Sequence, residues 1–558
     1  MQETAGASTI ANMIAGKKPG YESEFVRFDQ MKAMVIDDMG AMRHALRSQL
    51  EWMGINTVKS VSNAEEALRQ LELTQFDLIL CDYNLNRSSS GQHFLEFLRT
   101  QHLISAKTVF VMVTAEAEYA YVANAVEFAP DDYILKPCPE KKLRTRLERL
   151  FDRRNFLMPA LLAMDAQQYD QVVSECDRLM TLVDNERWKM AALRLKAEAQ
   201  HALHDEANML KTYEQALALN NNAPWVKIGF ARAQRMRGDL DAAERTAQEI
   251  IAQHPSYVAA FELLGEIRKA RNDQAGAYEM IERASAILPS ARRFRVSSES
   301  AFLLGKLDEA KRYAESAIQL SSGSITESKE DYLSLAQIQT DVGEPEEAIR
   351  TLEWHARRFG EQGEFGVARN AILAQAYHDT GDTDKAKRLL ERALRVMPQD
   401  SRSETLNHVG KAALKLGDEI TGLKLMTQAV QGSDDRQRIA RHVAKSMRDT
   451  GRQDKVADVI DAGQKRILAL VDEAQKLMRS AQFAEAYAKL QEALTIHDEN
   501  IEALLAAAQL HLLWLKQQGW DAEIDARAKA YLATLDKLVP QNEKVMAFYR
   551  FYDQISEA

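Results

Sequence analysis

The sequence is poor in cysteine and has no long apolar run, and each scarcity excludes a class of protein. Three cysteines in 558 residues, none in a CxxC pair, leave no disulfide framework or cysteine-ligated zinc site, which indicates a reducing compartment. No apolar run reaches the roughly 18 residues that a membrane-spanning helix needs. The lysines near the mildly apolar residues 9–15 follow them, which is the wrong order for a secretory signal. We therefore expect a cytoplasmic protein without a membrane span.

Basic side chains are in the minority. The 82 acidic and 72 basic residues give a formal net charge of -10. Because phosphate recognition needs a basic face, this balance argues against nucleic acid as the main partner. The basic stretch at residues 141–154, KKLRTRLERLFDRR, has leucines at helical spacing and is better explained as an amphipathic helix.

A chain of this length is too long for one hydrophobic core, so at least two structural units are expected. Residues 1–31 show no sustained period and are expected to form a flexible tail. Residues 32–152 alternate short apolar runs with helical patterns, which predicts a doubly wound α/β domain with a five-stranded parallel sheet. Residues 153–558 lose all strand signals and are expected to be helical.

Five apolar runs mark the expected strands of the N-terminal domain. They cover residues 33–36, 57–61, 78–81, 109–113 and 133–135, and the expected helices cover residues 43–53, 64–73, 93–100, 117–128 and 140–151. A serine-rich loop is expected at residues 88–91, between the third strand and its helix.

Polar side chains follow four of these strands at their carboxyl ends: Asp37 with Asp38, Asp82, Thr114 and Lys136. Because these ends share one edge of a parallel sheet, the five side chains are expected to converge. Clustered carboxylates need a cation among them, and hard oxygen ligands favour Mg2+. With a lysine and a hydroxyl to hold phosphoryl oxygens, one aspartate could act as a nucleophile toward a phosphoryl group. The alternative is that each is an ordinary strand-ending polar residue.

The motifs of this region resemble the response-regulator receiver family over about residues 32–150. They are VIDD at 35–38, LILCDYNL at 78–85, VMVTA at 111–115 and DDYILKP at 131–137. The resemblance implies that Asp82 is the phosphoacceptor and that Asp37 and Asp38 hold Mg2+. It also implies that Asn84 supplies a backbone carbonyl to the metal, and that a sensor histidine kinase or phosphotransfer protein donates the phosphoryl group.

The same resemblance implies a switch. Thr114 is the hydroxyl that follows the phosphoryl group, Lys136 is its salt-bridge partner, and Tyr133 is the aromatic that rotates between outward and inward positions. Their shift is expected to alter the face formed by the fourth helix, fifth strand and last helix of the receiver. The loop after the acceptor departs from the family, since residues 85–87 and a serine run replace the usual Met-Pro pair. A receiver of this kind is a phosphoacceptor and not an enzyme, with at most slow self-dephosphorylation.

From residue 156 onward a turn residue recurs about every 34 positions, which is the period of a helix–turn–helix repeat. These turn residues are Gly238, Asn272, Gly305, Gly343, Gly381, Gly417 and Gly451. Fragments such as GKLDEAKRYAESAI and GDTDKAKRLLERALRVMP resemble tetratricopeptide repeats. Weaker repeats around Gln167, His204 and Ala481 bring the expected number to nine or ten over residues 155–515, with C-terminal capping helices. Gly422 and Val456 depart from the alanine expected five positions after a turn.

Stacked repeats of this kind form a superhelix whose concave surface typically binds peptides or protein domains. The repeat region carries no HExxH, GxxxxGK[ST] or GxSxG motif, so no catalytic function is indicated there. We therefore expect a two-component response regulator whose output is protein contact, with homodimerisation through the receiver as a further option. The alternatives are a transcriptional regulator that binds nucleic acid, and a constitutive scaffold that uses the receiver only as a dimer module.

Overall fold

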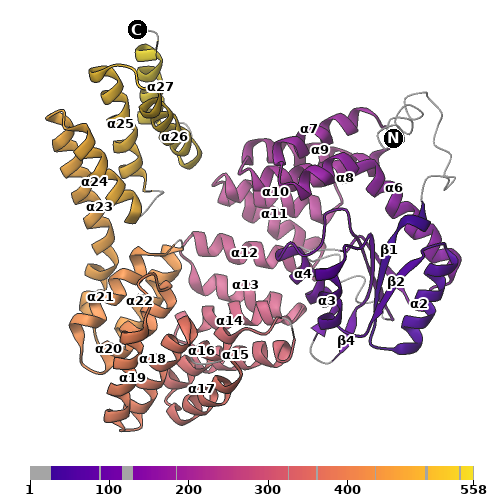
Figure 1. Ribbon diagram of the computed structural model, residues 1–558, viewed down its shortest axis with the longest axis horizontal. Coiled ribbons are helices and arrows are strands. Elements are labelled where there is room, and N and C mark those ends of the chain that lie inside the picture. The colour runs from indigo at the N-terminus through magenta and orange to yellow at the C-terminus, as the bar shows by residue number, and fades with distance from the viewer. Residues whose placement is uncertain are drawn as a thin grey trace. The chain divides into compact units, whose positions relative to one another are not determined.

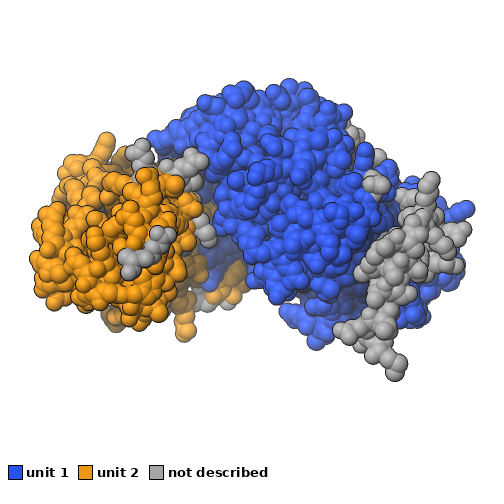
Figure 2. Space-filling model, turned by 90° about the horizontal axis from the view of Figure 1, so that it is seen from above, with its two compact units in different colours: residues 1–331 blue, residues 332–558 orange. Residues whose placement is uncertain are grey.

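The computed structural model describes residues 27–86, 89–115, 130–183, 185–324, 326–359, 362–433, 435–496, 500–539 and 542–556. The chain forms two compact units, Met1–Asp331 and Tyr332–Ala558, shown in two colours in Figure 2. The division falls within helix α16 (Lys329–Val342). The first unit contains the sheet and the first helical repeats, and the second unit is helical throughout its described part (Figure 1).

Five parallel strands form the sheet of the first unit in the order β2-β1-β3-β6-β7, which confirms the predicted doubly wound fold. The strands are β1 (Lys32–Ile36), β2 (Thr57–Val61), β3 (Leu78–Asp82), β6 (Val109–Thr114) and β7 (Asp132–Leu135). The domain also contains the 3-10 helix η1 (Phe28–Gln30) and the helices α2 (Gly40–Trp52), α3 (Ala64–Leu73), α4 (Gly91–Thr100) and α6 (Glu140–Asp165). The helix predicted at residues 117–128 lies outside the described residues.

Both faces of the central strands are buried, which explains why their sequences are continuous apolar runs. In β3, Leu78 and Leu80 enter a core with residues of α2 and α6. The alternate residues Ile79 and Cys81 enter the opposite core with residues of α3 and α4 (Figure 1). The central strands are therefore covered on both sides, and their polar residues lie at the strand ends.

The last helix of this domain, α6, is longer than the sequence predicted. It was expected to end near Phe151, and it continues to Asp165. Leu147 belongs to the core beneath the sheet, whereas Phe156 and Ala160 belong to a separate cluster with residues of α7 and α8. The sheet domain and the first repeat therefore share one helix, and the boundary expected between residues 152 and 153 falls inside it.

The charged residues after Phe151 have partners in the sheet domain. Arg153 forms an ion pair with Asp131, and Arg154 lies 3.1 Å from a carboxylate oxygen of Asp77. These charges attach the middle of α6 to the loops that precede two strands of the sheet. They therefore mark a packed section of the helix and not its end.

The expected serine loop contains a small strand pair. Strands β4 (Asn84–Asn86) and β5 (Ser89–Ser90) are antiparallel, with Asn84 opposite Ser90. The Ser90 hydroxyl then accepts a hydrogen bond from the His93 N–H at 3.2 Å and caps α4. This pairing joins the residues that follow Asp82 to the residues that precede α4.

The remaining elements of the described chain are helices. They are α7 (Tyr169–Thr181), α8 (Glu186–Ala202), α9 (Glu206–Leu219), α10 (Pro224–Met236), α11 (Leu240–Gln253), α12 (Val258–Ala270), α13 (Gln274–Ile287), α14 (Ala291–Leu303), α15 (Leu307–Ser321), α16, α17 (Pro345–Phe359), α18 (Gly363–Asp379), α19 (Thr383–Val396), α20 (Ser403–Lys415), α21 (Glu419–Gln431), α22 (Arg436–Asp449), η2 (Gln453–Lys455), α23 (Val456–Arg479), α24 (Phe483–Ile496), α25 (Ile501–Gln518), α26 (Ala522–Leu538) and α27 (Glu543–Ser556). No helix in this described part, or earlier in the described chain, is long and apolar enough to cross a membrane.

The predicted turn positions are confirmed by the backbone. The seven turn residues from Gly238 to Gly451 all have φ between 61° and 91°. The three weaker turns have φ of 56° at Gln167, 53° at His204 and 56° at Ala481. A left-handed residue after a helix ends that helix and reverses the chain, and glycine adopts this conformation at the lowest cost. The period in the sequence therefore reflects a recurring backbone conformation.

Two departures from the repeat pattern have structural causes. At Gly422, an added Cβ would lie 2.5 Å from the Leu414 side chain and 3.1 Å from the Leu414 backbone nitrogen, so α20 and α21 approach too closely for alanine. Val456 begins α23, a helix of 24 residues with the Gly451 turn before it and the Ala481 turn after it. This single helix follows one turn and precedes the next, so it belongs to two successive helix pairs. The regular spacing of about 34 residues in the array therefore ends here.

A buried charge cluster links three helices of the second unit. Lys411 in α20 lies 2.7 and 2.8 Å from the two carboxylate oxygens of Asp341 in α16, and 3.2 Å from Asp449 in α22. Lys445 also donates to both oxygens of Asp449, at 2.9 and 3.2 Å. The side chains of Lys411 and Asp341 are only 3% and 7% exposed, so their charges depend on each other for compensation.

His408, three residues before Lys411 in α20, predicts that acid destabilises the second unit. Burial lowers the pKa of His408 to about 4, and the charges of Lys411 and His442 add to this effect. Since an unfolded histidine titrates near 6.5, full stability is expected above about pH 6.5 and a loss of up to about 3 kcal/mol as the pH falls to about 4.

Urea unfolding of the wild-type chain at pH 7 and pH 4.5 measures this loss. His408→Gln is expected to lose less stability between the two pH values, because glutamine cannot take up a proton. His201→Gln, at an exposed site on α8, is the control. An unchanged pH dependence in His408→Gln would contradict the prediction.

Candidate functional site

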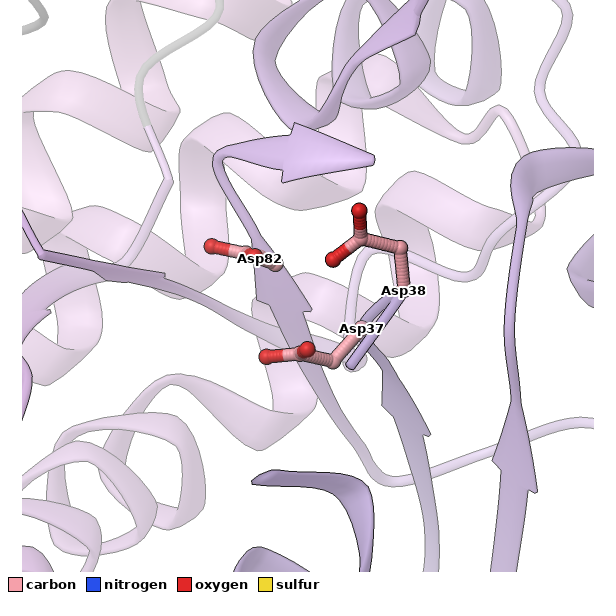
Figure 3. A group of neighbouring side chains, drawn as sticks. All are labelled: Asp37, Asp38 and Asp82. Carbon is pink, nitrogen blue, oxygen red and sulfur yellow. The ribbon is translucent and has the colours of Figure 1, made fainter. Parts of the chain in front are cut away.

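The structure brings the predicted acids together at the carboxyl edge of the sheet. Asp37 and Asp38 directly follow β1, and Asp82 is the last residue of the neighbouring strand β3. A carboxylate oxygen from each of the three lies within 4.8 Å of the other two, and Figure 3 shows the side chains side by side at the ends of these strands. Asp37 and Asp82 are buried, whereas Asp38 is exposed.

Lys136 reaches the same cluster from the end of β7. Its Nζ donates to Asp37 Oδ2 at 2.7 Å and lies 3.0 Å from Asp82 Oδ2. The Lys136 N–H donates to the Thr114 carbonyl at 2.7 Å, so pairing between the strand ends places the side chain. A cis peptide bond follows between Lys136 and Pro137. One cation therefore bridges two buried carboxylates.

Burial and pairing have opposite effects on the pKa values of Asp82 and Lys136. Burial raises the pKa of Asp82, while Lys136 and a backbone hydrogen bond from Asn84 act to lower it. Burial acts to lower the pKa of Lys136, but its hydrogen bonds to Asp37 and Asp82 outweigh that effect and raise it. Lys136 therefore remains protonated at neutral pH, and its charge compensates the acids when they are ionised.

The other predicted residues lie close to this cluster but differ in exposure. The Thr114 side chain is buried at the end of β6. Tyr133 is partly buried in β7, and its hydroxyl donates to Gln92 Oε1 in α4 at 3.3 Å. Burial raises the pKa of Tyr133, so its hydroxyl keeps its proton. Asn84 is exposed in β4, two residues after Asp82.

Sequence reasoning did not identify two residues that shape the site. The Arg43 guanidinium donates to the backbone carbonyls of Asp37 at 2.6 Å and Asp38 at 2.9 Å, which fixes the loop that carries both acids. An arginine one turn into the following helix was the available signal. The other residue, Gly91, begins α4, and only its position after the serine run distinguished it.

Gly91 is required by a close approach to the acceptor strand. A Cβ at this position would lie 2.2 Å from the Asp82 carbonyl oxygen, 2.9 Å from Met112 Sδ and 3.0 Å from Cys81 Sγ. Because the nearest atom belongs to the backbone, it cannot move aside without shifting Asp82 itself. The absence of a side chain at Gly91 therefore helps to position Asp82.

We expect Gly91→Ala to destabilise the sheet domain by about 2 kcal/mol, since the added methyl group overpacks a buried contact. Denaturant dependence of hydrogen exchange in the β3 peptide of the full chain measures the change. Gly40→Ala is the matched control, because Gly40 also begins a helix of this domain and its added Cβ would meet only Arg43, at 3.6 Å. Equal stability of the two variants would argue against the close approach.

The donor set fits a divalent cation with a preference for oxygen. Three carboxylates from two strand ends offer hard oxygen ligands on one side of the site, and exposed Asp38 leaves that side open to solvent. Among the described residues, Asp37, Asp38 and Asp82 form the group of three or more potential metal ligands found close together. Thiol and imidazole ligands play no part in it, which distinguishes it from a zinc site.

The family comparisons agree with the two parts of the chain. Residues 33–148 match the response regulator receiver domain family, and residues 200–267 and 370–400 match tetratricopeptide repeat families. The chemotaxis protein CheY-3 of Vibrio cholerae is 28% identical over 123 residues, which span 22% of this chain and 93% of that protein. The chemotaxis protein CheY of Pseudomonas aeruginosa is 27% identical over 125 residues, or 22% of this chain and 99% of that protein.

Solved structures resemble each part separately. A tetratricopeptide repeat protein from Parabacteroides merdae covers 46% of this chain and 98% of its own, with 12% identity and a TM-score of 0.35. The chemotaxis response regulator CheY4 of Vibrio cholerae covers 22% of this chain and 98% of its own, with 25% identity and a TM-score of 0.20. Together with the sheet order and the recurring turns, the family matches identify the chain as a receiver domain fused to an array of tetratricopeptide repeats.

Proposed function

We propose that the chain is a phosphorylation-controlled response regulator in which Asp82 accepts a phosphoryl group and the repeat array provides the output. The observation that carries the proposal is the bridging of Asp37 and Asp82 by the Lys136 ammonium group at the carboxyl edge of the sheet. The homology of residues 33–148 to receiver domains supports a response-regulator role. The donor is a phosphohistidine on a sensor histidine kinase or phosphotransfer protein.

In the transfer, an Asp82 carboxylate oxygen forms a bond to phosphorus as the bond between phosphorus and the donor imidazole nitrogen breaks. The imidazole keeps the electron pair of that bond and takes up a proton. Lys136 is positioned to pair with a phosphoryl oxygen once Asp82 is modified, because its Nζ already lies 3.0 Å from that carboxylate. Thr114 ends the adjacent strand, and its hydroxyl is the candidate donor to another phosphoryl oxygen.

Asp37, Asp38 and Asp82, with the Asn84 carbonyl, are the groups that would hold Mg2+. When bound, this ion would neutralise charge on the phosphoryl oxygens. Asp37 is oriented for this role by the Met39 N–H, which donates to its Oδ1 at 2.8 Å. We expect no catalytic turnover by the chain other than slow self-dephosphorylation.

The array is proposed to bind a protein or peptide in a manner controlled by the receiver. Tetratricopeptide matches at residues 200–267 and 370–400 support protein contact as the output. The test is a pull-down with the full chain held in its phosphorylated form by beryllofluoride and Mg2+, compared with Asp82→Ala under the same conditions. Different sets of bound proteins would support control of binding by phosphorylation, and identical sets in both samples would contradict it.

A further inference from the structure

Receiver helix α4 begins in contact with the acceptor residue. The Gly91 N–H donates to the Tyr83 carbonyl at 2.7 Å, and Gly91 packs against the Asp82 backbone with no room for a Cβ. One residue later, Gln92 accepts a hydrogen bond from the Tyr133 hydroxyl. Two separate contacts therefore connect the start of α4 to the acceptor and to the expected switch aromatic.

Helix α4 also contacts the repeats of the same compact unit, one turn further along. The Glu96 carboxylate is 3.8 Å from the Arg292 guanidinium in α14. The same guanidinium is 3.8 Å from Glu262 in α12. Helices α12 and α14 are the first helices of two successive repeats, since each precedes a left-handed turn residue.

The array side of this contact carries an excess of positive charge. Glu262 is engaged mainly by Arg293, whose Nε donates to it at 2.8 Å, so the more distant Arg292 is only partly compensated. Glu96 of the receiver supplies the missing negative charge. Burial lowers the pKa of His93 in α4 to about 4, and the charge of Arg293 adds to this effect.

The turn after α4 is attached to the array at a second point. The Ser105 hydroxyl and the Ala106 N–H both donate to the carboxylate of Asp165, the last residue of α6, and the second of these bonds is 2.6 Å long. Lys107 Nζ lies 3.9 Å from the same carboxylate. The middle of α4 and the turn after it are therefore both attached to helices outside the sheet core, the first to α14 and the second to the end of α6.

We propose that helix α14 is the docking surface for receiver helix α4, and that phosphorylation of Asp82 releases α4 from it. The release step rests on the function proposed above. The contact belongs to the third helix of the receiver. It is thus distinct from the face expected from the family resemblance, whose fourth helix lies outside the described residues.

The contact is suited to reversal. Arg292 is about half exposed, and ion pairs between partly exposed side chains contribute little to stability, so a modest change in α4 can break this one. A phosphoryl group on Asp82 changes the partners of Lys136 and Thr114 at the ends of β6 and β7. Tyr133 lies in β7 beside Met112 of β6, so a shift of these strand ends would remove its hydrogen bond to Gln92.

Charge reversal tests the docking contact without phosphorylation. In the full chain, Arg292→Glu is expected to raise hydrogen exchange of α4 and of the first turn of α14 by about threefold, as loss of a weak ion pair implies. Adding Glu96→Arg should restore slow exchange in both segments, since the two charges are then exchanged and attract each other again. Arg283→Glu is the matched control, because Arg283 pairs with Glu279 on the exposed face of α13. Unchanged exchange of α4 in Arg292→Glu would overturn the docking proposal.

The release step is tested by beryllofluoride and Mg2+ on the wild-type chain. Faster exchange in α4 and in the start of α14, together with protection around Asp37 and Asp82, is the expected result. Gln92→Ala should keep the protection at the acids and lose most of the response in α14. Protection at the acids with no change in α14 of the wild type would overturn release while leaving the proposed function intact. No protection at the acids would count against the proposed function and release together, while the charge-reversal variants would still decide the docking contact.

Discussion

Replacing Asp82 by asparagine is expected to lower phosphoryl uptake from a small-molecule donor such as acetyl phosphate by more than about 100-fold, because the nucleophilic carboxylate is lost. The measurement is the intact mass of the full chain after incubation with the donor and Mg2+. Wild-type protein should gain one phosphoryl group. Hydroxylamine removes a phosphoryl group from aspartate but not from a hydroxyl side chain, so it distinguishes modification of Asp82 from modification elsewhere. Asp82→Asn should gain none that is sensitive to hydroxylamine.

The substitution is chosen to preserve the fold. Asparagine has nearly the volume of aspartate, and Lys136 keeps its 2.7 Å hydrogen bond to Asp37. Burial already disfavours the charged form of Asp82, so removing its charge relieves an unfavourable burial. Lys136 loses only its ion pair with Asp82. Asp29→Asn, at an exposed acid before β1, is the control and should label like the wild type. Full labelling of Asp82→Asn would mean that another residue is the acceptor.

Lys411→Met in the second unit is expected to destabilise that unit by about 3–5 kcal/mol. Methionine fills a similar volume, so the loss comes from the charge of Asp341, which would stay buried with its main partner gone. Asp449 suffers less, since Lys445 still donates to both of its oxygens. Urea unfolding followed by the tryptophan fluorescence of the full chain measures the change in the midpoint.

Two further variants separate charge from packing. Lys415→Met removes a lysine of the same helix that pairs with Asp379 in a more solvated position, and it should cost less than about 1 kcal/mol. Lys411→Met combined with Asp341→Asn should recover much of the stability, because both buried charges are then gone. Failure of the double variant to recover any stability would show that the cluster acts through shape and not through charge.

The acidic site could be predicted because its residues follow strands whose apolar runs are visible locally. Asp37, Asp82 and Lys136 each come directly after such a run, and parallel strands bring the ends to one edge. The turns of the array could be predicted for a similar reason, since a left-handed residue such as Gly381 is required at each one. Local patterns with a regular period carried this information.

The rest depends on contacts between segments far apart in the sequence. The sequence near Gly91 does not show that the Asp82 backbone will leave no room for a Cβ there. Likewise, the sequence near Lys411 does not indicate that its partner is a carboxylate 70 residues earlier. The continuation of α6 beyond Phe151 also depends on distant partners, since Arg153 and Arg154 pair with acids in loops of the sheet. Glu96 and Arg292 likewise meet only after the repeats have folded back toward the receiver.

Helix α6 belongs to the receiver and to the first repeat without interruption, so its length sets their mutual rotation. An α-helix turns by about 100° and advances about 1.5 Å per residue. One residue inserted between Phe151 and Phe156 would swing the repeat around the helix axis and carry Asp165 away from Ser105 and Ala106. Lengthening by a full heptad would nearly restore the angle but shift the repeat along the axis. This helix should therefore accept substitutions far more readily than insertions or deletions.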